Sequence, residues 1–429
     1  MESMIKKQLC DTDPDGGCAL EAEALRFAGG ENIRIFDCYD GYRMALIENV
    51  KEQEFLAYCR ALACDGHTLY ADNEINGNLF RTWYTGSGEM LHCYWIRHSG
   101  EARIIVAQDA NLPIQSTGTA DVCTPLLHQL EALNPKKADG GMGYIIRLAD
   151  GRFLIVDGGY NSSDNVEAIY TFLKENAPEP EHVVIAAWYI SHAHIDHGGA
   201  FLGFAEAYSS DSTIILESIL FNACDTPEQM RYCTSITEQI ESVCQDYYRS
   251  VPKYKPLTGQ IYRFSTAIME ILYTMSDFLP NTIRQESDVA IRGEKNGDYN
   301  VESMVCIVDV DGRSGRGGRV CFLADATTEA CNEISSRYGE YLKSDFVQVG
   351  HHGIAPIPGA ENCRRHDATI EIYGYIAADI ALWPTSEAKV EERIVLEVNR
   401  YLASTVQEIV IAGAGGYTFL INGSEGECK

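Results

Sequence analysis

The sequence predicts an α/β protein in which a small α+β unit precedes a larger, layered α/β sandwich. The chain has 429 residues, more than one ordinary hydrophobic core accommodates, so two domains are expected. From Cys123 onward, strand-like runs alternate with helical runs, an order that is typical of sheets and helices packed in layers. We therefore expect residues 1–122 to form the small unit with a linker, and residues 123–429 to form the sandwich.

The small unit is predicted from residues 32–108. Residues 50–63 have apolar side chains at helical spacing. β-rich runs bounded by turn signals follow it, at residues 68–70, 78–84, 89–97 and 103–107. These runs are rich in aromatic residues, which either form one face of a small core or line a cleft or an oligomer contact: Trp83, Tyr84, Tyr94 and Trp95. Residues 109–124 are small and polar, and they are the predicted linker.

The sandwich is predicted from the elements that follow. A hairpin, a helix and a buried strand come first, at residues 144–148 with 153–156, at 166–175 and at 183–190. A second hairpin, a helix, a strand, another helix and two final strands come next, at residues 303–310 with 319–323, at 327–338, at 346–349, near 387–402, around 409 and at 417–421. The candidate chemical groups all follow strand ends, where loops commonly place functional side chains.

The strongest chemical signal directly follows the strand at residues 183–190. It consists of His192, His194, Asp196 and His197, followed by Gly198-Gly199. Imidazole nitrogens and carboxylate oxygens are the ligands that zinc and similar metals prefer, and a loop can turn these four side chains toward two neighbouring ions. We expect the two glycines to allow a tight backbone turn before a helix begins at Ala200. Desolvating so many polar rings together would be costly without such a role.

The remaining single histidines are interpreted as ordinary surface or core residues, because nothing near them has the spacing of metal ligands: His67, His92, His98, His128, His182 and His366. A basic segment, residues 313–319, has the glycines of a phosphate-binding loop. It is predicted to lie in a hairpin turn and not ahead of a helix, so an exposed loop is the better interpretation. The segment Trp383-Pro384-Thr385 follows a strand on the side expected to hold the site.

The His-x-His-x-Asp-His pattern at residues 192–197 resembles the metallo-β-lactamase superfamily, over most of residues 123–429. Before it, the run that ends in Asp157-Gly158-Gly159 looks like the family's strand that supports the metal loop from behind. After it, residues 322–325 look like the strand whose final aspartate bridges both metals, and residues 347–353 look like the strand that delivers the last histidine. The resemblance implies an αββα sandwich and a hydrolase with two divalent ions, zinc first, or manganese or iron.

The resemblance also implies a role for each candidate ligand. His192 and His194 would hold the first metal, Asp196 and His197 the second, and Asp325 would contact both. His352, directly before Gly353, would be the remaining ligand of the second metal. The catalytic residues would then be Asp196, which would help to orient the attacking hydroxide, and His351, which would contact a substrate oxygen or protonate a leaving group. The sequence alone allows His351 and His352 to exchange these roles.

The chain departs from the family pattern at one point. The family often has another histidine between the first loop and the bridging aspartate, yet none occurs from Ser210 to Gly350. A water molecule or a side chain would complete the first site, with Asn222, Cys224 and Asp225 as candidates, or this metal binds less tightly. The His351-His352-Gly353 motif and the missing histidine both resemble the branch of DNA-uptake channel hydrolase domains and phosphorylcholine esterases, which implies phosphodiester chemistry.

Three other functions are consistent with the same residues. The metal pair is also suited to hydrolysis of a lactam, lactone or thioester in a different pocket. A di-iron centre would support electron-transfer or oxygen chemistry, although the flavin-linked relatives usually have a carboxylate where this chain has His194. A binding or regulatory module could retain the metal site without catalysis, since a half-filled site can be structural.

Net charge, apolar runs and cysteine spacing indicate which partners and which compartment to expect. The formal net charge of −28 would repel a long nucleic acid unless a basic groove or bound metal offset it, so a small-molecule substrate is expected. No apolar run reaches membrane-spanning length, and the first residues lack the apolar core of a secretory signal, so we expect a cytoplasmic protein with no membrane partner. The 15 cysteines are scattered without a Cys-x-x-Cys pair, which favours reduced thiols. A homo-oligomer is compatible with the sequence.

Overall fold

The computed structural model describes residues 27, 30–38, 41–85, 88–107, 112–117, 122–134, 136, 138–223, 235–286, 299–310, 318–354 and 368–421. The chain divides into two compact units. The first comprises Met1–Asp72 and Gly77–Ala110, and the second comprises Asn73–Asn76 and Asn111–Lys429. Cys224, Asp225, His366 and most of the basic segment at residues 313–319 lie outside the described residues.

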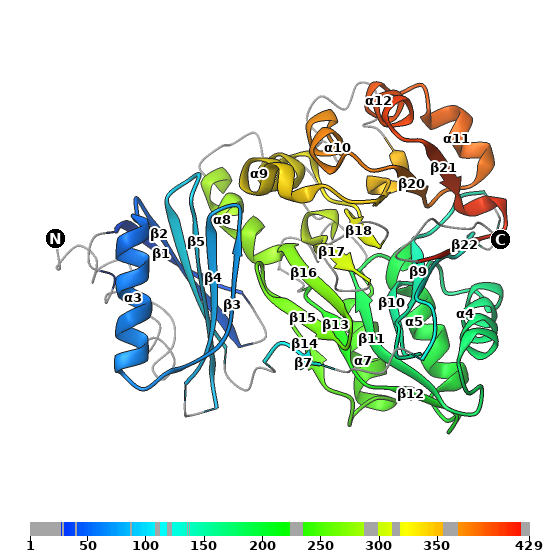
Figure 1. Ribbon diagram of the computed structural model, residues 1–429, viewed down its shortest axis with the longest axis horizontal. Coiled ribbons are helices and arrows are strands. Elements are labelled where there is room, and N and C mark those ends of the chain that lie inside the picture. Colours follow the sequence, from blue (N-terminus) through cyan, green and yellow to red (C-terminus); the bar gives the residue numbers. More distant parts are fainter. Residues whose placement is uncertain are drawn as a thin grey trace. The chain divides into compact units, whose positions relative to one another are not determined.

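In its described residues, the first unit is a six-stranded sheet with the helix α3 (Glu52–Cys64) on one face (Figure 1). The strand order is β1-β2-β6-β5-β4-β3, and the strands are β1 (Glu31–Asp37), β2 (Tyr42–Glu48), β3 (Thr68–Ile75), β4 (Asn78–Tyr84), β5 (Met90–Ile96) and β6 (Glu101–Ala107). Phe55 and Leu62 of α3 pack into a core with Trp83 and Trp95. Of the four aromatic residues singled out in the sequence, only Tyr84 is exposed.

The second unit contains two eight-stranded sheets. In the first sheet the order is β14-β13-β11-β10-β9-β8-β22, and β12 pairs with β11 off this path. Its strands are β8 (Leu126–Gln129), β9 (Gly143–Arg147), β10 (Phe153–Asp157), β11 (Val183–Ile190), β12 (Ile214–Leu216), β13 (Ile219–Phe221), β14 (Lys253–Tyr254) and β22 (Tyr417–Leu420). The predicted hairpin is present as antiparallel β9 and β10, and β11 pairs with β10 in parallel.

The second sheet of this unit has the order β21-β20-β19-β18-β17-β16-β15-β7. Its strands are β7 (Gln115–Ser116), β15 (Ile261–Phe264), β16 (Ala267–Tyr273), β17 (Val305–Asp309), β18 (Arg319–Phe322), β19 (Phe346–Gln348), β20 (Ile380–Trp383) and β21 (Glu408–Ile411). The predicted second hairpin is present as antiparallel β17 and β18. β7 lies within the predicted linker and pairs with β15.

Helices cover the outer faces of the two sheets, which produces the αββα sandwich (Figure 1). Beside the first sheet lie α4 (Ser163–Asn176), α5 (Ile195–Tyr208) and α7 (Thr237–Asp246), whose apolar side chains share a core with β10 and β11. The other helices within the described residues are α8 (Met275–Glu286), α9 (Thr328–Tyr338), α10 (Ile370–Ile376), α11 (Glu387–Arg393) and α12 (Glu397–Thr405). Short 3-10 turns are η2 (Tyr299–Glu302), η3 (Gly339–Leu342), η4 (Gly350–Gly353) and η5 (Ala412–Ala414).

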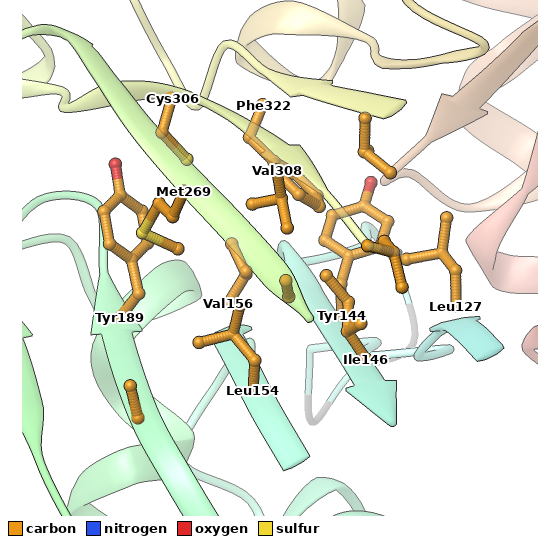
Figure 2. Close-up of a cluster of buried hydrophobic side chains, with 14 of the residues drawn as sticks. Leu127, Tyr144, Ile146, Leu154, Val156, Tyr189, Met269, Cys306, Val308 and Phe322 are labelled. Carbon is orange, nitrogen blue, oxygen red and sulfur yellow. The ribbon is translucent and has the colours of Figure 1, made fainter. Parts of the chain in front are cut away.

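The main core fills the space between the two sheets (Figure 2). Leu154 and Tyr189 from the first sheet meet Val308 and Phe322 from the second, and all are fully buried. Alternate residues of β10 face the other way, so Ile155 packs toward the helices beside Ile169. Because strands buried on both faces leave little room for polar groups, the candidate ligands lie beyond the strand ends.

Two differences from the sequence prediction concern helices near the candidate ligands or late in the chain, in addition to shifted ends such as that of β3, which continues to Ile75 and not to Tyr70. α5 begins at Ile195 and not at Ala200, so both glycines lie inside the helix. A Cβ on Gly199 would lie 2.6 Å from the backbone nitrogen of Asn161, so this glycine permits close packing and not a turn. The single helix expected near residues 387–402 is two helices, α11 and α12, separated at residues 394–396. Within the described residues, no helix has the length and apolar character that crossing a membrane requires.

Candidate metal centre

Each candidate ligand lies just beyond a strand of the sandwich. β11 ends at Ile190, and the chain passes through Ser191 to His192 and His194 before α5 begins. Asp196 and His197 occupy the first turn of α5, where the positive end of the helix dipole favours a carboxylate. Asp325 follows β18, and the histidine pair follows β19 in η4.

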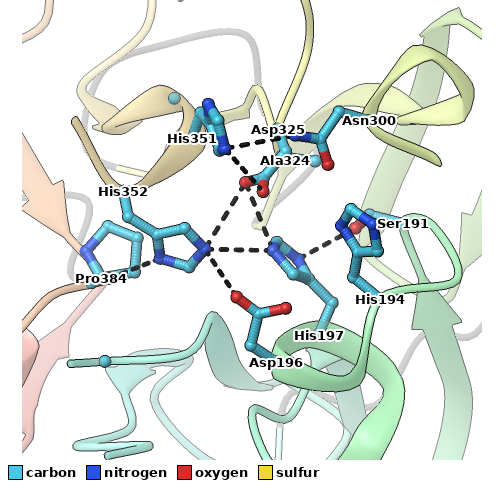
Figure 3. Close-up of polar contacts among 12 residues, drawn as sticks. Ser191, His194, Asp196, His197, Asn300, Ala324, Asp325, His351, His352 and Pro384 are labelled. Carbon is cyan, nitrogen blue, oxygen red and sulfur yellow. Dashed lines mark hydrogen bonds and ion pairs between the residues drawn. The ribbon is translucent and has the colours of Figure 1, made fainter. Parts of the chain in front are cut away.

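The structure gathers six of these side chains into two groups of three, and Figure 3 labels all of them except His192. His192, His194 and Asp325 form one group, and Asp196, His197 and His352 form the other. Within each group, one potential ligand atom of every residue lies within 4.8 Å of the others. The ring nitrogens His197 Nε2 and His352 Nε2 are 3.2 Å apart, although these residues are 155 positions apart in the chain.

Asp325 links the two groups through its separate oxygens. Its Oδ1 lies 3.3 Å from His197 Nε2 and 3.6 Å from His352 Nε2. Its Oδ2 lies 3.9 Å from His192 Nε2 and 3.8 Å from His351 Nε2. One carboxylate therefore faces both groups, which is the arrangement a bridging ligand needs.

Asp157 supports the loop from behind. This fully buried residue accepts hydrogen bonds from the Ser191 backbone N–H at 2.7 Å and from Ser191 Oγ at 2.8 Å. Its Oδ2 is also 2.8 Å from His197 Nδ1. A carboxylate at Nδ1 keeps the proton on that nitrogen and leaves Nε2 free to face the cluster, as is common for metal-binding histidines.

His351 and His352 occupy different positions. His352 is 3% exposed, and its Nδ1 is 2.7 Å from the carbonyl oxygen of Pro384, so its Nε2 is the nitrogen directed at Asp196 and Asp325. His351 lies at the edge of the cluster with its side chain 15% exposed, and its Nε2 is 3.2 Å from Asn300 Nδ2 (Figure 3). The geometry therefore groups His352 with the ligand atoms and leaves His351 beside them.

The charges of the cluster are strongly coupled. Burial lowers the pKa of His192 well below its ordinary value, and neighbouring histidines add to this effect. Burial also opposes the charged form of His197, but the carboxylates of Asp325 and Asp157 outweigh it and raise the pKa of this imidazole well above its ordinary value. Burial opposes the charged form of Asp325 as well, yet the imidazoles around it hold the pKa of its carboxyl well below its usual range. The cluster thus keeps a buried anion between basic groups.

These residues fit a pair of divalent cations. Asp325 Oδ1 is buried, and no described residue donates a hydrogen bond of suitable geometry to it. A buried carboxylate oxygen without a donor is costly unless a cation compensates it. Nitrogen and carboxylate ligands suit zinc, and also manganese or iron.

The first group remains one protein ligand short. Of the three candidates to complete it, only Asn222 is described. It lies one residue beyond β13, next to the β11 end in the parallel register, and is buried. Its Nδ2 donates to the Pro256 carbonyl oxygen at 2.5 Å, while no described residue donates to its Oδ1. Its side chain thus retains an acceptor without a donor among the described residues.

Two residues near the cluster had no signal in the sequence. Asn300 comes from η2, and nothing in the local pattern around it predicts a contact with His351. Tyr160 follows the Asp157-Gly158-Gly159 run, and burial first and then the carboxylates of Asp196 and Asp139 raise the pKa of its phenol. The described histidines outside the cluster, namely His67, His92, His98, His128 and His182, belong to neither ligand group.

Comparison with known families agrees with this architecture. A family model described as the Metallo-beta-lactamase superfamily matches residues 138–216, which include β9, β10, β11 and the residues from His192 to His197. The second unit has the metallo-β-lactamase fold. A search of curated proteins found no match.

Several solved structures are similar to this chain. The metallo-beta-lactamase fold protein YhfI from Bacillus subtilis is 13% identical over 69% of this chain and 99% of its own, with a TM-score of 0.41. CmlA, a diiron beta-hydroxylase from Streptomyces venezuelae, is 12% identical over 71% of this chain and 55% of its own, with a TM-score of 0.40. A long form RNase Z from yeast is 10% identical over 53% of this chain and 32% of its own, with a TM-score of 0.31. At these values, the activities of those proteins do not transfer to this chain.

Proposed function

We propose that the metallo-β-lactamase unit is a hydrolase that depends on two divalent cations. Zinc is the metal that we favour, and manganese and iron are the alternatives. The observation that supports this most directly is the position of Asp325, whose two oxygens face two separate groups of ligand atoms. His192 and His194 would hold one ion, and Asp196, His197 and His352 the other, with Asp325 between them. With Asp325 shared, three side chains would hold the first ion and four the second, so the two ions would be bound with different affinities.

A pair of divalent ions, when bound, acidifies water and stabilises negative charge that develops on a substrate oxygen. The side chains of the chain supply the rest. Asp196 is half-buried, with 24% of its side chain accessible, so its carboxylate is placed to orient the attacking water. His351 stands beside the cluster and is accessible, and we assign it to hold a proton for the leaving oxygen.

The substrate class that we favour is a phosphodiester or a related small phosphoester. The support is the resemblance of the His351-His352-Gly353 motif, together with the absent middle histidine, to the phosphodiester-cleaving branch of the superfamily. A net charge of −28 favours a small molecule over a long polyanion. The described cysteines are all free thiols, which fits a reducing compartment such as the cytoplasm. A lactam, lactone or thioester is the second candidate.

The test begins with metal analysis and proceeds to substrates. Protein loaded with zinc or manganese is assayed on bis-p-nitrophenyl phosphate, nitrocefin and a homoserine lactone. We expect two ions per chain and turnover of the phosphodiester. His192→Ala and Asp325→Ala should abolish turnover with the circular dichroism spectrum unchanged, whereas His182→Ala, an exposed histidine outside both groups, should retain it.

The outcomes separate the alternatives. Turnover of the lactam or the lactone alone would replace the phosphodiester assignment with the second candidate. A visible iron absorption band on the purified protein would favour a di-iron centre. Tightly bound metal without turnover of any substrate would favour a binding or regulatory module. Failure to bind any transition metal, or undiminished turnover in the His192/Asp325 double variant, would end the proposal.

A further inference from the structure

The turn that delivers the histidine pair has an unusual backbone. His351, His352 and Gly353 have φ angles of 46°, 51° and 70°, so three consecutive residues lie in the left-handed region. Residues other than glycine rarely adopt it, and they do so where the surroundings hold them there. The turn therefore needs support from outside its own segment if His352 is to face the cluster.

That support comes from side chains that grip the carbonyl oxygens of the turn. The His352 carbonyl oxygen accepts hydrogen bonds from Arg393 Nη1 at 3.0 Å and from Trp383 Nε1 at 2.8 Å. The Gly353 carbonyl oxygen accepts one from Asn399 Nδ2 at 2.8 Å, and the same amide donates to the Arg393 carbonyl oxygen at 2.8 Å. Residues of α11 and α12 thus hold the turn from one side.

Arg393 also binds a second segment. Its guanidinium pairs with Asp139, with Nη2 2.5 Å from Oδ2 and Nη1 3.2 Å from Oδ1, and Nη1 donates to Thr385 Oγ1 at 2.7 Å. Thr385 Oγ1 in turn donates to Asp139 Oδ1 at 2.9 Å. With 7% of its surface exposed, Arg393 is a buried cation whose fork joins a carboxylate, a hydroxyl and a carbonyl.

The segment that contains Asp139 continues directly to the second ligand group. Gly141 lies so near the backbone of Asp196 that a Cβ on it would be 2.5 Å from the Asp196 carbonyl oxygen. The next backbone N–H, that of Met142, donates to this same oxygen at 2.9 Å. Arg393 therefore connects the turn of His352 with the segment that fixes the backbone of Asp196, while no contact described for it reaches a ligand atom of either residue.

We propose that Arg393 is a positioning residue for the second ligand group, which sets the separation of His352 and Asp196 through their backbones. The inference rests on the proposed function only in taking this group as a metal site. By this proposal, α11 and α12 support a ligand group although both helices lie far along the chain from the His192–His197 loop. The alternative, a buried ion pair that only stabilises the fold, makes a different prediction.

A matched pair of variants distinguishes the two. Arg337 is also a buried arginine, and its ion-pair partners, Asp277 at 2.8 Å from Nη1 and Glu333, belong neither to the ligand groups nor to the histidine turn. We would compare Arg393→Lys and Arg393→Met with Arg337→Lys and Arg337→Met. Cobalt(II) titration, read from its visible absorption bands, measures the affinity of each ion, and hydrogen exchange by mass spectrometry on metal-free protein measures the turn itself.

We expect Arg393→Lys and Arg393→Met to retain one equivalent of cobalt and to bind the other at least tenfold more weakly, because outer partners of metal ligands commonly contribute that much. Metal-free Arg393→Lys should exchange faster in peptides that cover residues 349–354 and 138–144. The Arg337 variants should lower only the melting temperature. Two results would overturn the inference. One is that the Arg393 and Arg337 variants weaken the binding of both cobalt ions to the same extent. The other is that both Arg393 variants bind cobalt, and exchange amide hydrogens, as the wild type does. If wild-type protein binds no cobalt but the exchange effect is present, the proposed function fails and the support of the turn stands.

Discussion

Replacing Asp157 by asparagine tests whether the carboxylate behind the cluster selects the metal-binding form of His197. The side chain keeps its size, and an amide oxygen can still accept from the Ser191 backbone N–H, which now donates to Asp157 Oδ1 at 2.7 Å. The other carboxylate oxygen, 2.8 Å from His197 Nδ1, becomes an amide N–H₂ group. An amide donor at that position requires Nδ1 to be an acceptor, which moves the ring proton to Nε2, the nitrogen that faces Asp325.

The size of the effect follows from this change of tautomer. Loss of an outer partner of a metal-binding histidine commonly costs 10- to 100-fold in affinity, or about 1.4–2.8 kcal/mol. We expect Asp157→Asn to weaken the second ion by that factor and to leave the first ion nearly unaffected. Competition against a chromogenic chelator measures both affinities.

The matched control is Asp150→Asn. Asp150 lies in the turn between β9 and β10, where it accepts a hydrogen bond from Arg152 Nε at 2.9 Å, far from any described contact with the cluster. Both variants should remain folded by circular dichroism. If Asp157→Asn binds both ions as tightly as the wild type, the carboxylate does not select the tautomer and our reasoning about His197 is wrong.

Three further changes test the surrounding structure. Burial lowers the pKa of His128 from 6.5 to about 4, so the unfolded chain takes up this proton at a higher pH than the folded chain does. Between pH 7 and pH 4.5, urea titrations should therefore show that the wild type loses about 2–3 kcal/mol of unfolding free energy relative to His128→Gln. A difference in unfolding free energy between the two proteins that does not change with pH would refute this. Trp188→Phe removes the buried indole N–H that donates to the Asp157 carbonyl oxygen at 2.7 Å, and calorimetry should show a loss of about 2–4 kcal/mol. Gly353→Ala would place a Cβ 2.6 Å from Trp383 Cζ2 at a φ of +70°, so a lower melting temperature and weaker binding of one ion are expected; an unchanged thermal transition would contradict this.

Much of the fold could be predicted because its signals are local. The strand at residues 183–190, the two hairpins and the helices that became α4 and α9 follow from the spacing of apolar residues over a few turns or pleats. The start of α5 could not be predicted in this way. Two glycines in succession suggest a turn, whereas at Gly199 the deciding factor is the approach of the Asn161 backbone, which lies in a different loop.

The histidine pair shows the same limit within the site. Adjacent residues of the same type offer no local difference, so the sequence left the roles of His351 and His352 interchangeable. In the structure the two rings have different positions, because His352 Nδ1 faces the Pro384 carbonyl oxygen and His351 lies beside the Asn300 amide, and both partners come from other parts of the chain. The core of the small unit likewise could not be predicted from local patterns, because α3 packs against residues from several strands of the sheet.

By itself, the sequence determined which chemistry is available, because residue type and short spacing already place imidazoles and carboxylates directly after a buried strand. The tertiary structure decided which atoms meet. Asp139 and Arg393 are 254 positions apart, and His197 and His352 are 155 apart, so their contacts depend on how the two sheets and their helices pack. No local pattern encodes such pairs, since the free energy that brings them together comes from burial of the whole core and not from either segment alone.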